Sequence, residues 1–221
     1  MKKAVSILIL FVLSAVSLTG CSNNAEPFEQ KSYTADISQV QSIQIDVRDR
    51  TIEVSQSNDG QIHIDYSENS KERYEISVSD GHVLTMTAAN KKEWTDYVGG
   101  KPADEDRRIS LQVPNEMLDS LTISTTNENI SLQPLTVSKD ITLTANGGNI
   151  TFDKLNAGNA TVLDAKNGNI TGSIAGRYED YAITCEIKKG ESNLPADKEK
   201  GTKRLQVNGN NGDIDIEFIN E

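Results

Sequence analysis

The sequence predicts an all-β protein, a single-stranded, β-helix-like β-solenoid of about five coils of ~20 residues, with a small antiparallel cap sheet before them. A motif of the form Asn/Gly-x-Asn/Asp-Ile recurs at twenty-residue spacing, with one interruption. Apolar and polar residues alternate strictly in the runs between the motifs, which is typical of strands with one buried face. Aromatic residues are only 5% of the chain, and narrow ladders of Ile, Leu and Val need few of them.

The first element is an export signal at residues 1–20. Lys2 and Lys3 precede an uncharged run of 13 residues, Ala4–Val16, which is shorter than the ~20 residues of a membrane-spanning helix. The run leads to Leu18-Thr19-Gly20-Cys21, which resembles the lipobox of bacterial lipoproteins. We therefore expect Cys21 to be the lipidation site, with acyl chains such as palmitate holding the protein on the membrane. The alternative is cleavage elsewhere, with Cys21 as a bystander.

Lipidation would place the mature chain on the extracytoplasmic face of the cell membrane without spanning it. Residues 21–35 are polar and lack periodicity, which indicates a flexible lipidated tether. Without Lys2 and Lys3 the mature chain has 20 basic and 33 acidic residues, a net charge of 20 − 33 = −13. This balance excludes nucleic acid as a partner bound through its phosphates.

The two cysteines then have separate roles. With Cys21 lipidated, Cys185 has no partner for a disulfide. Cys185 alternates with Ile183 and Ile187, which indicates a buried strand residue and not a reactive nucleophile.

Residues 36–117 are expected to form an N-terminal β region that caps the solenoid. The repeat pattern occurs once here, at Ile43, Ile45, Ile52 and Val54. Strand-like runs follow at 61–66, 74–78 and 83–87, with tight turns at Asp59-Gly60 and Asp80-Gly81. We expect these runs to pair as an antiparallel sheet over the first coil, because an open solenoid end invites aggregation.

An insert at residues 88–108 breaks the strand pattern and contains the single Trp of the chain. Interface energy concentrates in Trp, Tyr and Arg side chains. Trp94, Tyr97, Arg107 and Arg108 are therefore a candidate binding loop. The other interpretation is that Trp94 folds back over the solenoid as a structural lid.

Residues 118–221 contain the main array of repeats. Four segments share one ending: Asn127-Glu128-Asn129-Ile130, Gly147-Gly148-Asn149-Ile150, Asn167-Gly168-Asn169-Ile170 and Asn211-Gly212-Asp213-Ile214. A second apolar run begins nine residues before each ending, so each coil has two strands joined by a corner of Asn, Gly and Asp. Leu194 is expected to fill the slot of the coil that lacks the motif, and the corner Asn side chains are expected to stack into ladders.

The competing architecture is an antiparallel β-sandwich, because Asn-Gly is also a strong hairpin signal. Hairpins alone do not require the same apolar residue type at a fixed spacing of twenty. This spacing favours the solenoid. No helix of useful length is expected in the mature chain.

Val113-Pro114, followed by repeated units that end in Asn211-Gly212-Asp213-Ile214-Asp215-Ile216, resembles the bacterial family of unknown function described as putative adhesins. The likeness covers roughly residues 40–219. It implies a β-solenoid on an exported or membrane-associated protein, and some relatives accompany cell-envelope stress systems. The sequence differs from the family pattern in its corner Asn residues, where Ser or Gly is more frequent, and in the insert at 88–108.

No pattern in the sequence indicates catalysis, a metal site or a cofactor. His63 and His82 are the two histidines, and they lack the spacing of a metal or acid–base pair. Nucleophile-elbow, P-loop and dinucleotide-binding motifs do not occur. Ca²⁺ takes six to eight oxygens, and the acidic residues at the corners are too few in any coil to supply them. These acidic residues are Asp153, Asp164, Asp213 and Asp215.

A second irregular stretch contains a candidate basic patch on this acidic chain: Lys188, Lys189, Lys198, Lys200, Lys203 and Arg204. Such a patch would face anionic lipid headgroups or wall polymers. The other interpretation is a solvated loop.

These features predict a lipid-anchored, non-catalytic, adhesin-like binding or scaffold module of the bacterial envelope. Its partner would be an envelope or extracellular protein or polysaccharide. One alternative is an accessory protein in envelope-stress sensing. Another is a β-helix enzyme that acts on cell-surface polysaccharide, which a clustered acidic pair with a basic neighbour in a groove would favour.

Overall fold

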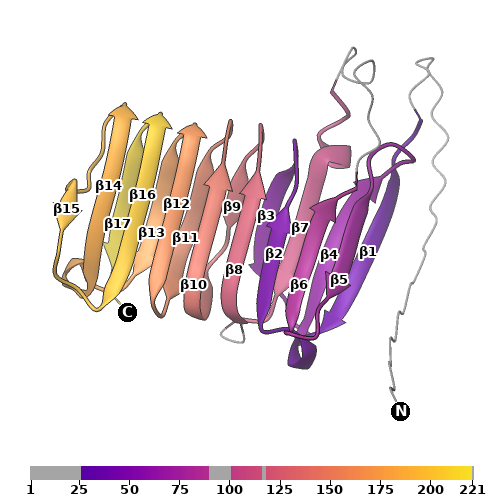
Figure 1. The fold of residues 1–221 in the computed structure, drawn as a ribbon, viewed down its shortest axis with the longest axis horizontal. Helices are drawn as coiled ribbons and strands as arrows, with labels where there is room; N and C mark the ends of the chain where they lie inside the picture. Colours follow the sequence, from indigo (N-terminus) through magenta and orange to yellow (C-terminus); the bar gives the residue numbers. More distant parts are fainter. Residues whose placement is uncertain (1–25, 90–100, 116–117, 221) are drawn as a thin grey trace.

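The computed structural model describes residues 26–89, 101–115 and 118–220. These residues form seventeen strands that stack side by side in two layers (Figure 1). The helices in the described ranges are 3-10 turns of three residues. None of them has the length or the apolar run that crossing a membrane requires.

The first layer runs from the N-terminal cap to the C-terminal coils. Its order is β5 (Tyr74–Val78), β6 (Val83–Ala88), β2 (Ser42–Asp46), β8 (Leu118–Thr125), β10 (Leu135–Ala145), β12 (Ala160–Asn167), β16 (Lys203–Asn211) and β14 (Tyr181–Lys189). β15 (Asp197–Lys198) pairs with the outer edge of β14.

The second layer lies behind the first in the same direction. Its order is β1 (Glu29–Asp36), β4 (Gln61–Glu68), β7 (Arg108–Val113), β3 (Thr51–Gln56), β9 (Ile130–Leu132), β11 (Ile150–Ala157), β13 (Ile170–Ala175) and β17 (Ile214–Ile219). β10 joins the layers, because its first residues pair with β11 and its later residues pair with β8 and β12.

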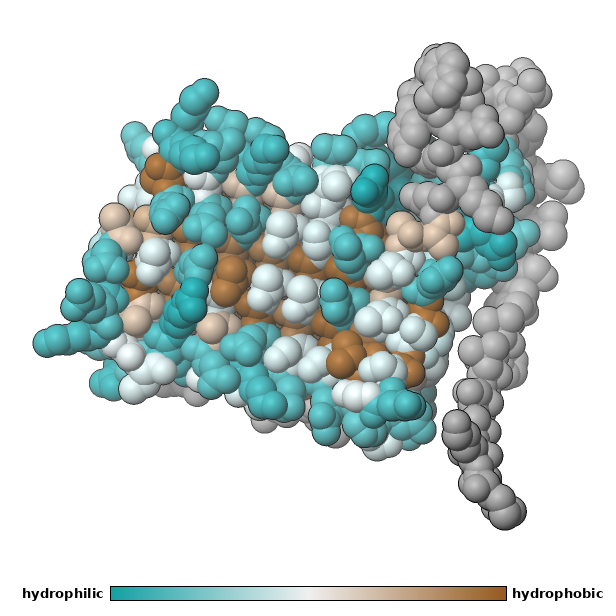
Figure 2. Space-filling model, in the orientation of Figure 1, coloured by the Kyte–Doolittle hydropathy of each residue, from teal (hydrophilic) through white to brown (hydrophobic). Residues whose placement is uncertain are grey.

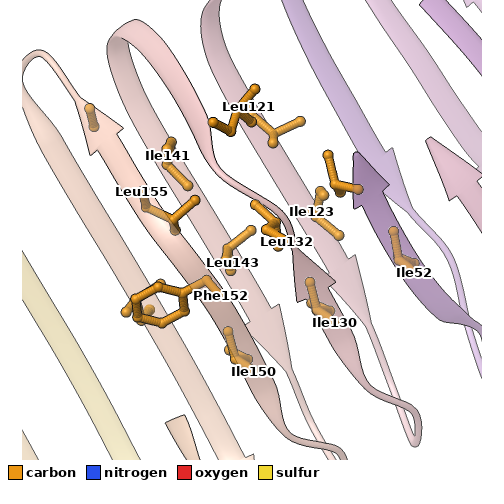
Figure 3. Close-up of a cluster of buried hydrophobic side chains, with 14 of the residues drawn as sticks. Ile52, Leu121, Ile123, Ile130, Leu132, Ile141, Leu143, Ile150, Phe152 and Leu155 are labelled. Atoms are coloured by element: carbon orange, nitrogen blue, oxygen red, sulfur yellow. The ribbon is translucent and has the colours of Figure 1, made fainter. Parts of the chain in front are cut away.

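The core between the layers consists of ladders of equivalent residues from successive coils. Ile150 is paired in register with Ile130 on one side and Ile170 on the other, and all three side chains are fully buried. Figure 3 shows the Ile and Leu side chains from both layers pointing toward one another. The pairing through these coils is parallel, so the predicted stacking is confirmed and the antiparallel sandwich is excluded.

Side-chain oxygens at the corners join each coil to the next. The Oδ1 atoms of Asn129, Asn149 and Asn169 accept hydrogen bonds of 2.8–2.9 Å from the backbone N–H of the residue stacked on each: Asn149, Asn169 and Asp213. Asp213 continues the ladder by accepting from the Glu191 N–H at 2.9 Å. The predicted ladder is therefore present, and it satisfies backbone donors that a sharp corner would leave unpaired.

The glycines beside this ladder are required by close contact between coils. A Cβ atom on Gly168 would lie 2.2 Å from the carbonyl oxygen of Gly148, and one on Gly212 would lie 2.3 Å from the carbonyl oxygen of Gly168. No side chain fits at such distances, so these positions admit glycine alone.

The stacking order differs from the chain order at both ends. The coil β16–β17 lies between β12–β13 and β14, although β14 precedes it in the sequence. Likewise, β2–β3 lies between β6–β7 and β8–β9. Twenty-residue spacing identifies which segments stack, but it carries no information about their order where long connections intervene.

The prediction for Leu194 is wrong by two residues. Ser192 is paired with Ile214, so Gly190-Glu191-Ser192 is the corner of this coil. Leu194 is still buried. The corner was not recognised in the sequence because a Ser stands where the other repeats have Ile.

The cap is only partly antiparallel. β6 and β7 pair in parallel with β2 and β3 and so continue the coils, whereas β1, β4 and β5 pair antiparallel with their neighbours. β1 also occupies the last seven residues, 29–35, of the stretch expected as tether, residues 21–35. Its Tyr33 and Ala35 pair with Ile64 and Ile62 of β4, and these partners make a strand of a weakly apolar segment.

Candidate binding surfaces

The outer face of the first layer carries rows of small polar side chains. One row crosses seven strands in register and is polar except for Val162: Thr85, Gln44, Thr122, Thr142, Val162, Gln206 and Thr184. Figure 2 shows side chains of neutral hydropathy in rows across the strands, with hydrophilic ones along the edges. This face is flat and rich in hydrogen-bonding groups.

The outer face of the second layer is similar but more acidic. Its corresponding row contains Ser110, Glu53, Ser131, Thr151, Thr171 and Asp215. Neither row contains a histidine or a cysteine. Hydroxyl, amide and carboxylate side chains dominate both rows and can form hydrogen bonds with a ligand.

A groove of about 660 Å³ lies at the C-terminal end of the first layer, where β12, β16 and β14 approach the corners. Asn146 lines it from the corner after β10, and the other polar lining residues come from these three strands: Asp164, Lys166, Asn208, Asn210, Glu186 and Lys188. Ala196, whose carbonyl accepts from the Cys185 N–H at 2.9 Å, contributes from the segment along the free edge of β14.

The charged residues that line the groove form two rows, one acidic and one basic. Asp164, Asn208 and Glu186 are directly paired across the three strands. Two residues further along each strand, on the same face, come Lys166, Asn210 and Lys188. Neighbouring strands are ~4.8 Å apart, so the two residues that flank each Asn are separated by ~10 Å between Cα atoms.

The predicted binding loop falls partly outside the described residues. Trp94 and Tyr97 lie outside them, so their role stays a prediction. Arg107 is buried and donates to the carboxylates of Glu128 and Asp104 and to the Pro102 carbonyl at 3.1 Å. Arg108 is exposed, and its Nε lies 3.4 Å from Glu53. Arg107 thus fixes the end of the insert to the corner of β8.

The six residues of the predicted basic patch are divided between the two ends of β14. Lys188 and Lys189 lie at one end of β14, whereas Lys203 pairs with Tyr181 at the other end. Lys198 lies near that second end, with Nζ 4.9 Å from the centre of the Tyr178 ring. Lys203 donates to Asn156 at 2.7 Å, and Arg204 donates to Gln206. Lys188 alone among the six lines the groove.

A buried polar cluster joins the cap to the coils, and sequence reasoning missed it. Arg50 donates to Tyr74 Oη and to Glu72 Oε2, both at 2.5 Å, and its side chain is 3% exposed. Burial favours the neutral guanidine, but the Tyr74 hydroxyl and the Glu72 carboxylate outweigh it and raise the pKa of Arg50. No motif marks this cluster, because Arg50 precedes β3 whereas Glu72 and Tyr74 lie more than twenty residues later, at the start of β5.

The remaining candidates for chemistry have structural partners. His63 Nδ1 lies 3.2 Å from Thr34 Oγ1, and His63 Nε2 lies 2.9 Å from Asp59 Oδ2. His82 Nδ1 lies 3.0 Å from the Gln39 carbonyl oxygen. Cys185 is buried, with Sγ 3.4 Å from Ser192 Oγ. In residues 26–89, 101–115 and 118–220, no group of three or more His, Cys, Asp or Glu side chains could hold a metal ion.

Comparison with known proteins agrees with this architecture. The family model described as Toastrack DUF4097 matches residues 40–220. A crystal structure of a putative cell adhesion protein from Clostridium sporogenes ATCC 15579 superimposes with a TM-score of 0.56 at 14% identity, covering 87% of this chain and 100% of that one. For a putative adhesin from Bacteroides fragilis NCTC 9343, the TM-score is 0.36 at 13% identity, with coverage of 86% and 97%. No curated protein matches the sequence.

Proposed function

Because this chain belongs to the Toastrack DUF4097 family, we propose that it is a non-catalytic, adhesin-like binding module of the bacterial envelope, anchored by lipid on Cys21. The observation that carries the proposal is the pair of flat outer faces with rows of Thr, Ser, Asn and Gln, one of which ends in the polar groove. The name of the structurally similar protein from Clostridium sporogenes, a putative cell adhesion protein, points to the same class of function.

Glu26, the first described residue after the proposed anchor, lies at the cap, at the opposite end of the solenoid from the groove. Glu26 accepts hydrogen bonds from Ser70 and Asn69 in the cap. Four residues lie between Cys21 and Glu26, and the five steps from Cα to Cα span at most ~18 Å when fully extended. The cap would therefore stay close to the membrane. The groove begins several strands away, where β12, β16 and β14 end the first layer.

An enzyme acting on polysaccharide is the second candidate, because Asp164 and Glu186 are an acidic pair with lysine neighbours in one groove. Inverting glycosidases separate their carboxyl groups by roughly 6.5–9.5 Å. Glu186, however, is exposed to solvent, whereas a catalytic acid usually lies in apolar surroundings. Asp164 also accepts a hydrogen bond from Asn208 at 3.4 Å. These surroundings favour binding over hydrolysis.

Photo-crosslinking on intact cells tests the proposal. A photoreactive residue replaces Gln206 on the first layer or, as a control, Ser131 on the second. We expect the Gln206 position to capture an envelope component and the Ser131 position to capture less of it. Absence of crosslinks at both positions would contradict the binding module. Release of sugars from cell-wall polysaccharide that depends on Asp164 and Glu186 would replace it with the enzyme.

A further inference from the structure

The groove presents four charged side chains that other residues leave available. Within the described part of the chain, Lys166, Lys188 and Glu186 form no ion pair and no side-chain hydrogen bond, and Asp164 accepts one bond, from Asn208 at 3.4 Å. Elsewhere in the same layer an acid and a base do pair, since Lys139 Nζ lies 2.9 Å from Asp119. The groove charges therefore remain free for a ligand.

The arrangement of these charges is dipolar. Asp164 and Glu186 place two negative charges in one row, and Lys166 and Lys188 place two positive charges in the next. The charges of these four side chains sum to zero. A purely anionic ligand would meet the two carboxylates, and a purely cationic one would meet the two lysines. The complementary ligand carries both signs.

The floor of the groove adds neutral hydrogen-bonding groups between the charges. Asn208 and Asn210 lie on the central strand β16, with Gly209 between them. Each amide offers two donor hydrogens and one acceptor oxygen. None of the described lining residues is aromatic. A small polar headgroup fits this lining better than a sugar ring that requires a stacking partner.

We infer that the groove binds a zwitterion of the phosphoethanolamine type, in which a short carbon chain joins a phosphate ester to an ammonium group. The phosphate would lie between Lys166 and Lys188, with the amide of Asn210 as a further donor. The ammonium would lie between Asp164 and Glu186. Lysine binds phosphate as a point charge. A tetrahedral phosphate presents oxygens to both lysines at once, which a planar carboxylate does less well.

This inference rests on the proposed function, since it names the class of ligand for that binding module. The same chemistry has two sources in an envelope. One is the headgroup of an ethanolamine phospholipid, and the other is a phosphoethanolamine substituent on an envelope polymer.

Calorimetric titration of the full chain, purified in a maltoside detergent, tests the inference. The probe is glycerophosphoethanolamine. Matched probes are glycerophosphoglycerol, which lacks the ammonium, and ethanolamine, which lacks the phosphate. We expect each matched probe to bind at least about tenfold more weakly than glycerophosphoethanolamine, since each loses one set of charge-assisted contacts.

Two double variants separate the halves of the site. Lys166→Gln with Lys188→Gln removes the positive row, and Asp164→Asn with Glu186→Gln removes the negative row. Each should weaken binding of glycerophosphoethanolamine by about tenfold or more. The control, Lys189→Gln with Asp140→Asn, makes one substitution of each kind outside the groove lining and should leave binding unchanged. Unfolding curves of all variants should coincide.

Nanodiscs of phosphatidylethanolamine or phosphatidylglycerol distinguish the two sources. Binding to phosphatidylethanolamine discs supports the inference with a lipid as source, and binding to the soluble probe alone supports it with a polymer substituent. The inference is overturned if glycerophosphoethanolamine gives no saturable heat, or if neither groove variant changes it. An envelope component captured at Gln206 by a chain that fails these titrations would leave the proposed function standing without this ligand.

Discussion

At the scale of single residues, the fold depends on side chains that repeat the same contact in every coil. The Oδ1 of Asn169 accepts from the backbone of the next coil, and Asp213 makes the equivalent contact one coil further. Ile130, Ile150 and Ile170 form the apolar equivalent of this ladder in the core. A change at one such position therefore disturbs the contacts with two neighbouring coils.

Ile150 is the clearest place to test the core. Its side chain is fully buried between two equivalent isoleucines. Ile150→Asp should lower the free energy of unfolding by about 4 kcal/mol, because it buries an unpaired charge, and Ile150→Val by about 1 kcal/mol. Thr151→Asp, whose side chain is exposed, should change it by less than about 1 kcal/mol. Urea denaturation measures all three, and equal losses for Ile150→Asp and Thr151→Asp would contradict the register.

The raised pKa of Tyr66 predicts how the free energy of unfolding changes at alkaline pH. Burial, reinforced by the Glu68 carboxylate, raises its pKa from 10.0 to about 12. Since the folded-state pKa is the higher one, its contribution to stability is complete below pH 10 and is lost as the pH rises through about 12. Phenolate absorbance should show a late transition that Tyr66→Phe removes, and the variant should lose less stability over this range. A late transition that persists in Tyr66→Phe would assign it elsewhere, for example to Tyr33 or Tyr74, whose pKa values burial also raises.

Substitution of Cys21 tests the proposed lipid anchor. Cys21→Ser removes the thiol that would carry the lipid, so the protein should lose acyl labelling and leave the membrane fraction. Labelling with a palmitate analogue, followed by fractionation of cells, measures both effects. Cys185→Ser is the matched control, and it should retain labelling because Cys185 is buried. Unchanged labelling of Cys21→Ser would end the lipoprotein hypothesis.

At the scale of elements, the long connections determine the order in which the coils stack, and the repeat alone does not determine this order. The coil β16–β17 inserts between β12–β13 and β14, so β14 has a single long partner strand, β16. The insertion also covers the edges of β12 and β13, which would otherwise present unpaired backbone groups. The C-terminal segment is thus an internal coil of the stack.

This order makes an unusual prediction about truncation. In a solenoid stacked in chain order, loss of residues 203–221 would leave β14 attached to the coil before it. Here the truncation removes the only long partner of β14, so residues 181–198 should become sensitive to proteases while β8 to β13 stay protected. Limited proteolysis with mass spectrometry measures this. Continued protection of residues 181–189 would contradict the observed order.

Sequence reasoning identified the repeated coils and missed the order in which they stack. Periodicity revealed Ile130, Ile150, Ile170 and Ile214 because buried ladders require equivalent side chains at equal spacing. The corner at Ser192 lacks the isoleucine, and the insertion of β16–β17 depends on long-range pairing that leaves no local pattern. The groove could not be predicted from the sequence for a related reason, since its charged residues lie on separate strands and come together only after folding. The scattered lysines of residues 188–204 suggested a patch that the strands then separated.

At the scale of the whole molecule, the solenoid has two different ends. The antiparallel strands β1, β4 and β5 and the Arg50 cluster close the N-terminal end, next to Glu26 where the chain emerges from the proposed anchor. The groove lies at the other end. Seven strand spacings of ~4.8 Å separate β5 from β14, a distance of ~34 Å along the first layer. A solenoid anchored at its cap would therefore hold the groove away from the membrane.

The distance of each end from a bilayer tests this arrangement most directly. The acylated protein is reconstituted in nanodiscs that contain an acceptor lipid, and a donor dye is attached to a cysteine introduced at Ser70 in the cap or at Asn210 in the groove. Energy transfer should be strong from position 70 and weak from position 210, because the short segment after the proposed anchor at Cys21 would hold the cap near the membrane. Equal transfer from the two positions, or stronger transfer from position 210, would contradict an anchored module that presents its groove outward.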